Sequence, residues 1–157
     1  MKIKSLLNVR NMIVIIIIFT VFLTIGLLTK SSQHHYVDIN NLVEEAYTTD
    51  AGYNSEVAKH MSLDVYKKSN INEIFKTEYP SKKADLVIKE LNQHKYDGDI
   101  YVYMKITLYI RDKITNKVIS AGIDIPVVFK VTNKDGQPFL ADKIEYVNQN
   151  NVPQKFR

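Results

Sequence analysis

Cysteine is absent from this chain of 157 residues. Its absence excludes a disulfide framework, thiolate zinc sites, a thiol nucleophile and a lipid-modified cysteine. Acidic residues are absent from the N-terminal part: residues 1–29 contain Lys2, Lys4 and Arg10 but no Asp or Glu. These bases supply +3 of the net charge of +4, which leaves the rest of the chain nearly neutral. The basic excess therefore indicates membrane topology rather than a phosphate-binding surface, and nucleic acid is not an expected partner.

Motifs of catalytic or metal chemistry are also lacking. The histidines form no H-x-x-x-H pair, and the sequence shows no Ser/His/Asp order and no glycine-rich phosphate loop. His34 and His35 are interpreted as linker residues, and His60 and His94 as solvent-facing residues of helices. The sequence therefore predicts no enzyme, no metal site and no cofactor.

A long uncharged hydrophobic run is present near the N-terminus. Met12–Leu28 contains no charged residue and lies between Arg10 and Lys30. At 1.5 Å per residue its helix would be ~26 Å long, close to the ~30 Å hydrocarbon core of a bilayer. The basic leader, residues 1–11, places the N-terminus in the cytoplasm and the rest of the chain outside it.

A cleaved signal peptide is the competing interpretation, because it shares the basic leader and the apolar run. Cleavage needs small residues at positions −3 and −1, and the nearest match, Thr29–Lys30–Ser31, is poor. We therefore expect a retained transmembrane helix over residues 12–29 and a linker over residues 30–36. The protein would then reside in the cell membrane, with its C-terminal domain outside the cytoplasm.

Apolar residues at helical spacing predict three helices at the start of the exported domain. Their first residues are Asp38, Ser55 and Ser81, and their ends are marked by Gly52, Lys67–Lys68 and Asp97–Gly98. Residues 71–79 fit either a helical turn, capped by Asn70, or a short strand.

Strict alternation of apolar and polar residues predicts three long strands in the last third of the chain. They cover residues 100–111, 118–131 and 138–147, and the second hairpin turn is Asn133–Gly136. The expected inward residues are Ile100, Val102, Met104, Ile106, Leu108 and Ile110 in the first strand, and Ile119, Ala121, Ile123, Ile125, Val127 and Phe129 in the second.

Gly122 and Pro126 fall on the outward face of the second strand, where proline cannot donate to a ladder, so a bulge or an edge position is expected there. A bulge bends a sheet. The expected fold is therefore α+β, with two to three helices packed on a curved antiparallel sheet that ends in a three-stranded meander. The polar tail, residues 148–157, is expected to fray.

The order helix, helix, short strand, helix and three long antiparallel strands resembles the nuclear transport factor 2-like (NTF2-like, cystatin-like) fold over about residues 37–147. Members held by one N-terminal helix include the bitopic scaffold proteins of type IV secretion and conjugation machines. Others are small exported proteins of low-GC Gram-positive bacteria, which share the Ile-, Lys-, Asn- and Tyr-rich composition. The resemblance implies an anchored scaffold, although the fold also hosts enzymes.

One carboxylate is a candidate for chemistry. Asp142 would point inward if its strand alternates strictly between Leu140 and Ile144. A buried lone carboxylate is costly unless it is paired. The alternative is a bulge that turns Asp142 outward.

A set of aromatic and basic residues is the candidate partner-binding surface. Tyr101, Tyr103 and Tyr109 share the outward face of the first long strand with Lys105 and Arg111. Aromatic and cationic residues are enriched in protein interfaces. The alternative is an ordinary solvated sheet face, in which tyrosine is simply a good strand former.

The sequence thus predicts a non-enzymatic, membrane-anchored scaffold or adaptor that binds protein partners of a cell-envelope assembly, or further copies of itself. Membrane confinement favours this function because it raises the effective concentration of partners. Two alternatives stay open: a small-ligand sensor or carrier that uses the domain interior, and an immunity-type inhibitor of an exported toxin.

Overall fold

Alternating residues and tight turns fold the second half of the chain into one antiparallel sheet. The computed structural model describes residues 35–76 and 81–157, so the predicted leader and transmembrane helix lie outside the described residues. Within those two ranges, no helix has the length and apolar character needed to cross a membrane.

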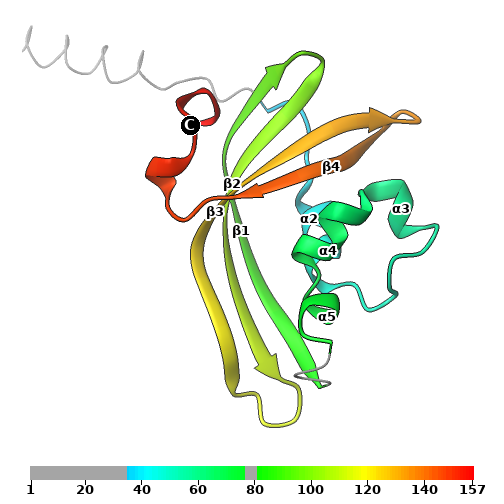
Figure 1. Ribbon diagram of the computed structural model, residues 1–157, viewed down its shortest axis with the longest axis vertical. Helices are drawn as coiled ribbons and strands as arrows, with labels where there is room; N and C mark the ends of the chain where they lie inside the picture. Colours follow the sequence, from blue (N-terminus) through cyan, green and yellow to red (C-terminus); the bar gives the residue numbers. More distant parts are fainter. Residues whose placement is uncertain (1–34, 77–80) are drawn as a thin grey trace, which may run out of the picture. The chain divides into compact units, whose positions relative to one another are not determined.

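The sheet has four strands in the order β1-β2-β3-β4, each antiparallel to its neighbour (Figure 1). Their bounds are β1 Lys82–Tyr96, β2 Asp99–Asp112, β3 Val118–Lys134 and β4 Gln137–Glu145. Two-residue turns close the first and last hairpins, Asp97–Gly98 with φ of 52° and 83° and Asp135–Gly136 with φ of 53° and 84°. Positive φ at both central residues matches the right-handed twist of the strands, which is why Asp-Gly stands in both places.

The third predicted helix, from Ser81 to Asp97–Gly98, is wrong: this segment is strand β1. Its apolar residues also satisfy a period of two, so the sequence pattern fits a helix and a strand alike. Pairing decides the outcome, because Leu86 lies opposite Leu108 and Ile88 opposite Ile106 on the apolar face of β2. The third helix of the element order on which the resemblance to the NTF2-like fold was based is therefore absent from this segment.

Short helices cover one face of the sheet (Figure 1). They are α2 Asn40–Thr48, α3 Val57–His60, α4 Leu63–Ser69 and α5 Ile71–Ile74. The helix expected from Ser55 is interrupted, because Met61 is extended and bridges to Leu140 of β4. Ser62 then caps α4 by accepting from the Val65 amide at 3.1 Å. Asn70 caps α5, so the ambiguous segment begins as a helical turn.

The core lies between these helices and the inner face of the sheet. Val102, Met104 and Ile106 of β2 are fully buried, as the alternation predicts. Phe129 of β3 and Val43 of α2 belong to the same cluster. The α+β class, with helices on an antiparallel meander, is therefore confirmed.

A bulge interrupts β3 where Gly122 and Pro126 predict one. Ile106 pairs with Ile125 and Leu108 with Gly122, so two residues of β3 lie between these pairs where β2 has one. The extra residue reverses the alternation. The inward assignments of Ala121 and Ile123 are therefore wrong. Ala121 lies opposite the outward Tyr109, and the Ile123 side chain is 68% exposed.

The C-terminal tail does not fray. It forms two short 3-10 turns, η1 Gln149–Asn151 and η2 Gln154–Phe156. Val152 and Phe156 are buried against Tyr103 and Val128, on the side of the sheet opposite the helices (Figure 1). The outer face is thus covered in part by the chain itself.

Candidate functional site

The structure divides the predicted partner-binding set into two groups. Tyr103 is only 4% exposed, and Tyr101 stacks on Phe156 with ring centroids 5.0 Å apart. Both tyrosines are on the predicted outward face, but the tail occupies it at that point. The expected exposure of Tyr103 is wrong, because burying Val152 and Phe156 supplies apolar contacts that the sequence pattern does not reveal. Tyr101 keeps part of its surface exposed, and its role in partner binding stays a prediction.

Lys105, Tyr109 and Arg111 form the second group and remain partly exposed. The Arg111 guanidinium donates to the Asp85 carboxylate at 2.6 Å and lies 5.8 Å from the centre of the Tyr109 ring. Lys105 lies 3.6 Å from Asp124. The cations on this face therefore have anionic neighbours within the domain.

Apolar side chains surround this second group. Val87 is 61% exposed, Val118 is 48% exposed and Ile123 is 68% exposed. Tyr109 pairs with Ala121 across the strands, and Arg111 pairs with Val118. We call the surface of Val87, Tyr109, Val118, Ala121 and Ile123 the open face.

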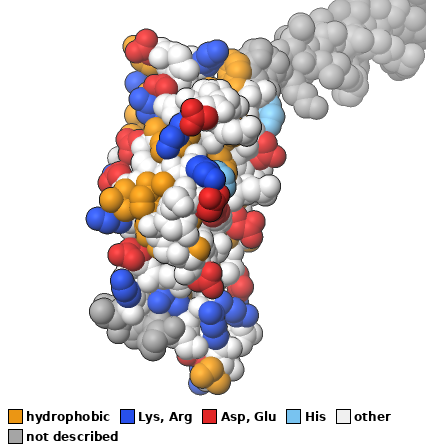
Figure 2. All heavy atoms as spheres, turned by 90° about the vertical axis from the view of Figure 1, so that its right-hand side faces the viewer, with side chains coloured by type: hydrophobic (Ala, Val, Ile, Leu, Met, Phe, Trp, Pro, Cys, Tyr) orange, Lys and Arg blue, Asp and Glu red, His pale blue; other side chains and the backbone are white. Residues whose placement is uncertain are grey.

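Sequence reasoning missed most of the open face. Val87 was hidden by the helical interpretation of β1, and Ile123 by the alternation that the bulge reverses. On the side of the domain that carries the helices, basic and acidic side chains are interspersed between small hydrophobic areas (Figure 2).

The free edge of β3 adjoins the open face. Strand β4 pairs with β3 only as far as Val127, followed by one bond from the Tyr146 amide to the Pro126 carbonyl at 2.9 Å. Within the described ranges, residues 118–125 of β3 therefore pair with β2 alone. A shallow groove of about 490 Å³ lies beside this edge, between Ile123 and Val147.

Asp142 points outward, as the bulge alternative expects. The register shifts between Lys130, opposite Asp142, and Val131, opposite Leu140. The shift leaves the Asp142 side chain 46% exposed, 3.9 Å from Lys68. Lys143 is turned inward instead and is 5% exposed.

Lys143 is the buried ionisable group of this region. Its ammonium donates to the Lys68 carbonyl at 3.1 Å and lies 3.4 Å from the Glu145 carboxylate. It also lies 4.6 Å from the centre of the Tyr47 ring. Burial lowers the pKa of Lys143, an effect that Glu145 opposes. Strand parity would identify Lys143 once the bulge is known, but nothing in the sequence marks that bulge.

Two histidines have carboxylate partners that the sequence did not suggest. His60 lies 2.7 Å from Glu45, and His35 lies 3.2 Å from Glu90. Each carboxylate is distant in sequence from its histidine, so no local motif predicts the pair. Over residues 35–76 and 81–157, no three His, Asp or Glu side chains come together as metal ligands would.

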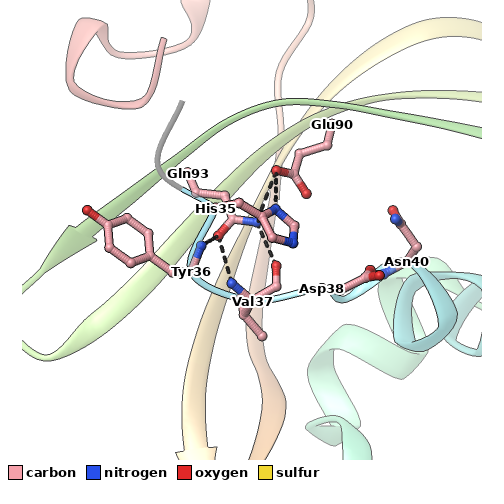
Figure 3. A network of polar contacts seen from close by, with 7 residues as sticks. All are labelled: His35, Tyr36, Val37, Asp38, Asn40, Glu90 and Gln93. Carbon is pink, nitrogen blue, oxygen red and sulfur yellow. Dashed lines mark hydrogen bonds and ion pairs between the residues drawn. The ribbon is translucent and has the colours of Figure 1, made fainter. Parts of the chain in front are cut away.

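The end of the predicted linker is attached to β1 by the Gln93 side chain and by the contact between His35 and Glu90 (Figure 3). The side-chain oxygen of Gln93, Oε1, accepts hydrogen bonds from the backbone amides of Tyr36 and Val37 at 2.7 and 3.0 Å. Its amide nitrogen donates to the Val37 carbonyl at 2.6 Å and to Glu90 at 3.0 Å. Gln93 is 5% exposed and satisfies linker backbone groups much as a neighbouring strand would.

Comparisons with known proteins add no relative. No protein-family model matches the chain, and no curated protein or solved structure matches it. The resemblance to the NTF2-like fold therefore stays a prediction, and the function must be argued from the surfaces described above.

Proposed function

We propose that the chain is a single-pass membrane protein whose extracytoplasmic domain is a non-enzymatic scaffold or adaptor. Its partners would be proteins of a cell-envelope assembly, of the conjugation or secretion type. The uncharged run Met12–Leu28 and the basic leader support the anchored, N-in topology. The open face supports the protein-binding role.

The observation that carries this proposal is the exposure of several apolar groups on neighbouring strands at one face of the sheet. Val87 of β1 and Ile123 of β3 are more than half exposed, at 61% and 68%. Tyr109 belongs to β2, the strand between them. Each apolar Å² removed from water contributes about 25 cal/mol, so covering these groups favours association. Contiguous apolar surface on a soluble domain commonly marks an interaction site.

Charged pairs are interspersed with the apolar residues of the open face. Asp85 lies opposite Tyr109 and Arg111 opposite Val118, and this pair and the Lys105–Asp124 pair remain partly solvated. Interfaces typically combine apolar and aromatic groups with polar ones. Mixed signs on this face favour a partner that also carries charges of both signs, rather than a strongly acidic one.

Photo-crosslinking in intact cells tests the proposal. A photoreactive amino acid is placed at Val87 or Ile123 of the full-length protein, and at Leu63 of α4 as the control. Leu63 is comparably exposed, at 44%, but belongs to the helical layer that packs against the other face of the sheet. We expect discrete protein adducts from the two open-face positions and none from Leu63.

The identity of the adducts separates the remaining alternatives. Adducts to envelope proteins support the scaffold role, dimers of the chain indicate self-association, and adducts to one exported toxin indicate an inhibitor. Equal labelling of all three positions, or of none, would mean that the open face is only a solvated sheet surface. The Tyr109→Ser variant should weaken the adducts without changing the thermal melting of the domain by more than a few degrees.

A further inference from the structure

The first half of β3 is a border of the sheet, because β4 pairs only with the second half (Figure 1). Residues 118–125 pair with β2 on one side, and on the other side they make no backbone hydrogen bond to any residue that the structure describes. In an antiparallel pair, alternate backbone groups point away from the neighbouring strand. This border therefore presents donors and acceptors that a further strand could satisfy.

The border formed by β1 differs in its charge. Strand β1 also pairs with β2 alone, but the exposed positions around Val87 are Lys83, Asp85 and Lys89. Charged side chains, lysine above all, keep an edge strand from pairing with another chain. Residues 118–123 of β3, Val-Ile-Ser-Ala-Gly-Ile, carry no charge and include three β-branched residues. This segment lacks the protection of β1 and is suited to accept a strand.

A turn and a bulge limit the length of the free border. The turn of residues 113–117 precedes it. At its other end Asp124 has φ of 52°, and its amide donates to the Thr107 hydroxyl at 3.1 Å instead of continuing a regular ladder. A bulge disrupts strand pairing locally. Residues 118–123 are thus left for a short, defined pairing rather than for an open-ended stack of strands.

The sequence of this border is self-complementary in an antiparallel pair. When Ala121 lies opposite Ala121 of a second copy, Ile119 lies opposite Ile123. Ser120 then lies opposite Gly122, so the small residues meet at the centre and the isoleucines meet on either side of it. Apolar cross-strand pairs of this kind stabilise a sheet. A shift by one residue would place side chains of opposite faces against each other.

The charges at the two ends of the border also suit a second copy. Lys117 is exposed at one end, and the Asp124 side chain is 65% exposed at the other. In the same antiparallel register Val118 lies opposite Asp124, which brings Lys117 of each copy near Asp124 of the other. Solvated pairs of this kind add little affinity, but they favour the antiparallel orientation over the parallel one.

We propose that residues 118–123 pair antiparallel with the same residues of a second copy of this chain, joining the two four-stranded sheets into one. Addition of a strand at a free edge is a common mode of recognition, and a two-fold axis makes such a contact self-limiting. This site is the edge of the sheet, so it goes beyond protein binding by the open face. Because Ala121 lies opposite Tyr109, the open faces of the two copies would adjoin at the axis.

Single cysteines test the contact, since the chain has none of its own. Opposed residues of an antiparallel pair have Cα atoms about 4.5–5.5 Å apart, which a disulfide can span. Full-length Ala121→Cys in phosphatidylcholine vesicles, treated with a mild oxidant, should form disulfide dimers at least about tenfold faster than the two controls. Ile114→Cys, 85% exposed in the turn, measures random collision, and Val87→Cys, 61% exposed, measures contact through the open face. Equal rates, or the fastest rate at Val87, would overturn the proposal.

A mixture of two variants tests the register. Ile119→Cys and Ile123→Cys should form disulfide dimers rapidly when mixed, because the two positions are opposed, and slowly when either variant is oxidised alone. A mixture no faster than the separate variants would refute antiparallel pairing centred on Ala121.

Ala121→Lys tests the contact without a covalent bond. Two lysines would then face each other at the axis, and like charges directly opposite are destabilising. Energy transfer between two labelled populations of the full-length protein in vesicles should report an association at least about tenfold weaker than in the wild type. Val87→Lys, on the β1 border, should associate normally, and both variants should melt within a few degrees of the wild type because both positions are exposed. Unchanged association of Ala121→Lys, or no association of the wild type, would overturn the proposal.

The occupant of the border is checked in intact cells. A photoreactive amino acid at Ala121 of the full-length protein should give dimers of the chain. Adducts to a different protein without dimers would assign the border to a foreign strand and overturn the pairing of copies. Adducts formed from Val87 report the open face separately, so the two proposals can fail independently.

Discussion

The two ends of the sheet share a covered inner face but differ in what covers the outer face. Around Tyr103 and Val128, which are 4% and 1% exposed, helices cover one face and the C-terminal tail covers the other. Around Val87 and Ile123, which are 61% and 68% exposed, only the inner face is covered. We call these the covered end and the open end. Whether an outward residue is core or surface therefore depends on what packs onto the sheet, and strand periodicity does not contain that information.

The largest effect that distinguishes the two ends is expected from paired tyrosine substitutions. Tyr103→Ser at the covered end removes a buried ring and should cost about 3–5 kcal/mol of unfolding free energy. Tyr109→Ser at the open end should cost about 1 kcal/mol or less, because its ring is partly exposed. Denaturant unfolding of both variants measures the difference. Equal losses would mean that the open end is also covered in the folded protein.

Removal of the last six residues should convert the covered end into an open one. Truncation after Asn151 exposes Tyr101 and Tyr103 and loses the buried side chains of Val152 and Phe156. Burial of one such side chain is worth about 1.5–3 kcal/mol, from which the entropy of ordering the tail must be subtracted. We expect a net loss of about 2–3 kcal/mol. The substitution of Gln154 by alanine is the control, since Gln154 is an exposed residue of the same tail.

The same truncation also tests the predicted partner-binding set. If the tail only stabilises the fold, photo-crosslinking through the open face will be unchanged in truncated protein that remains folded at low temperature. A photoreactive amino acid is also placed at Tyr101 of the truncated protein. If it forms adducts there, the tail competes with a partner for the covered end. Adducts lost altogether from a folded truncated protein would contradict the separation of the two ends.

A smaller effect is expected at the attachment of the linker to the covered end. Gln93→Leu leaves two amides and one carbonyl of Tyr36 and Val37 without their described partner. Part of this loss is recovered by water, so we expect about 1–2 kcal/mol. Lys95→Leu, at an exposed site of the same strand, should be nearly neutral. Hydrogen exchange at residues 36–37 should accelerate in the Gln93 variant alone, and unchanged exchange would mean that Gln93 does not hold the linker.

Much of the fold was predictable because its determinants are local. Alternation identified β2, β3 and β4, Asp135–Gly136 marked a hairpin, and Pro126 with Gly122 indicated the bulge. Strand β1 was missed because apolar residues at 84, 88 and 91 also satisfy helical spacing, and only pairing with β2 selects the strand.

Predictions about sites were less successful, because they depend on non-local contacts. One register shift near Ala141 exchanges Asp142 for Lys143 at the inner face. Two apolar residues in a polar tail, Val152 and Phe156, remove Tyr103 from the surface. Neither feature has a sequence signature that could be recognised without the pairing partner.

The smallest predicted effect concerns the turn that closes the open end. The Asp112 carboxylate accepts from the Thr115 amide at 2.6 Å, the Thr115 hydroxyl at 2.9 Å and the Ile114 amide at 3.0 Å. These hydrogen bonds lower the pKa of Asp112 below its ordinary value of 3.8, and the bonds from Thr115 contribute most. The folded protein therefore binds fewer protons at this site than the unfolded chain. The stabilisation is complete above pH 3.8 and is lost as the pH falls through the lower, folded-state value.

Asp112→Asn should show a flatter dependence of stability on pH below about 4, whereas Asp50→Asn, at an exposed site outside the sheet, should follow the wild type. Acid titration of thermal melting measures both. If Asp112→Asn retained the wild-type slope, the turn would not be held by this carboxylate, and the open end would lack its local closure.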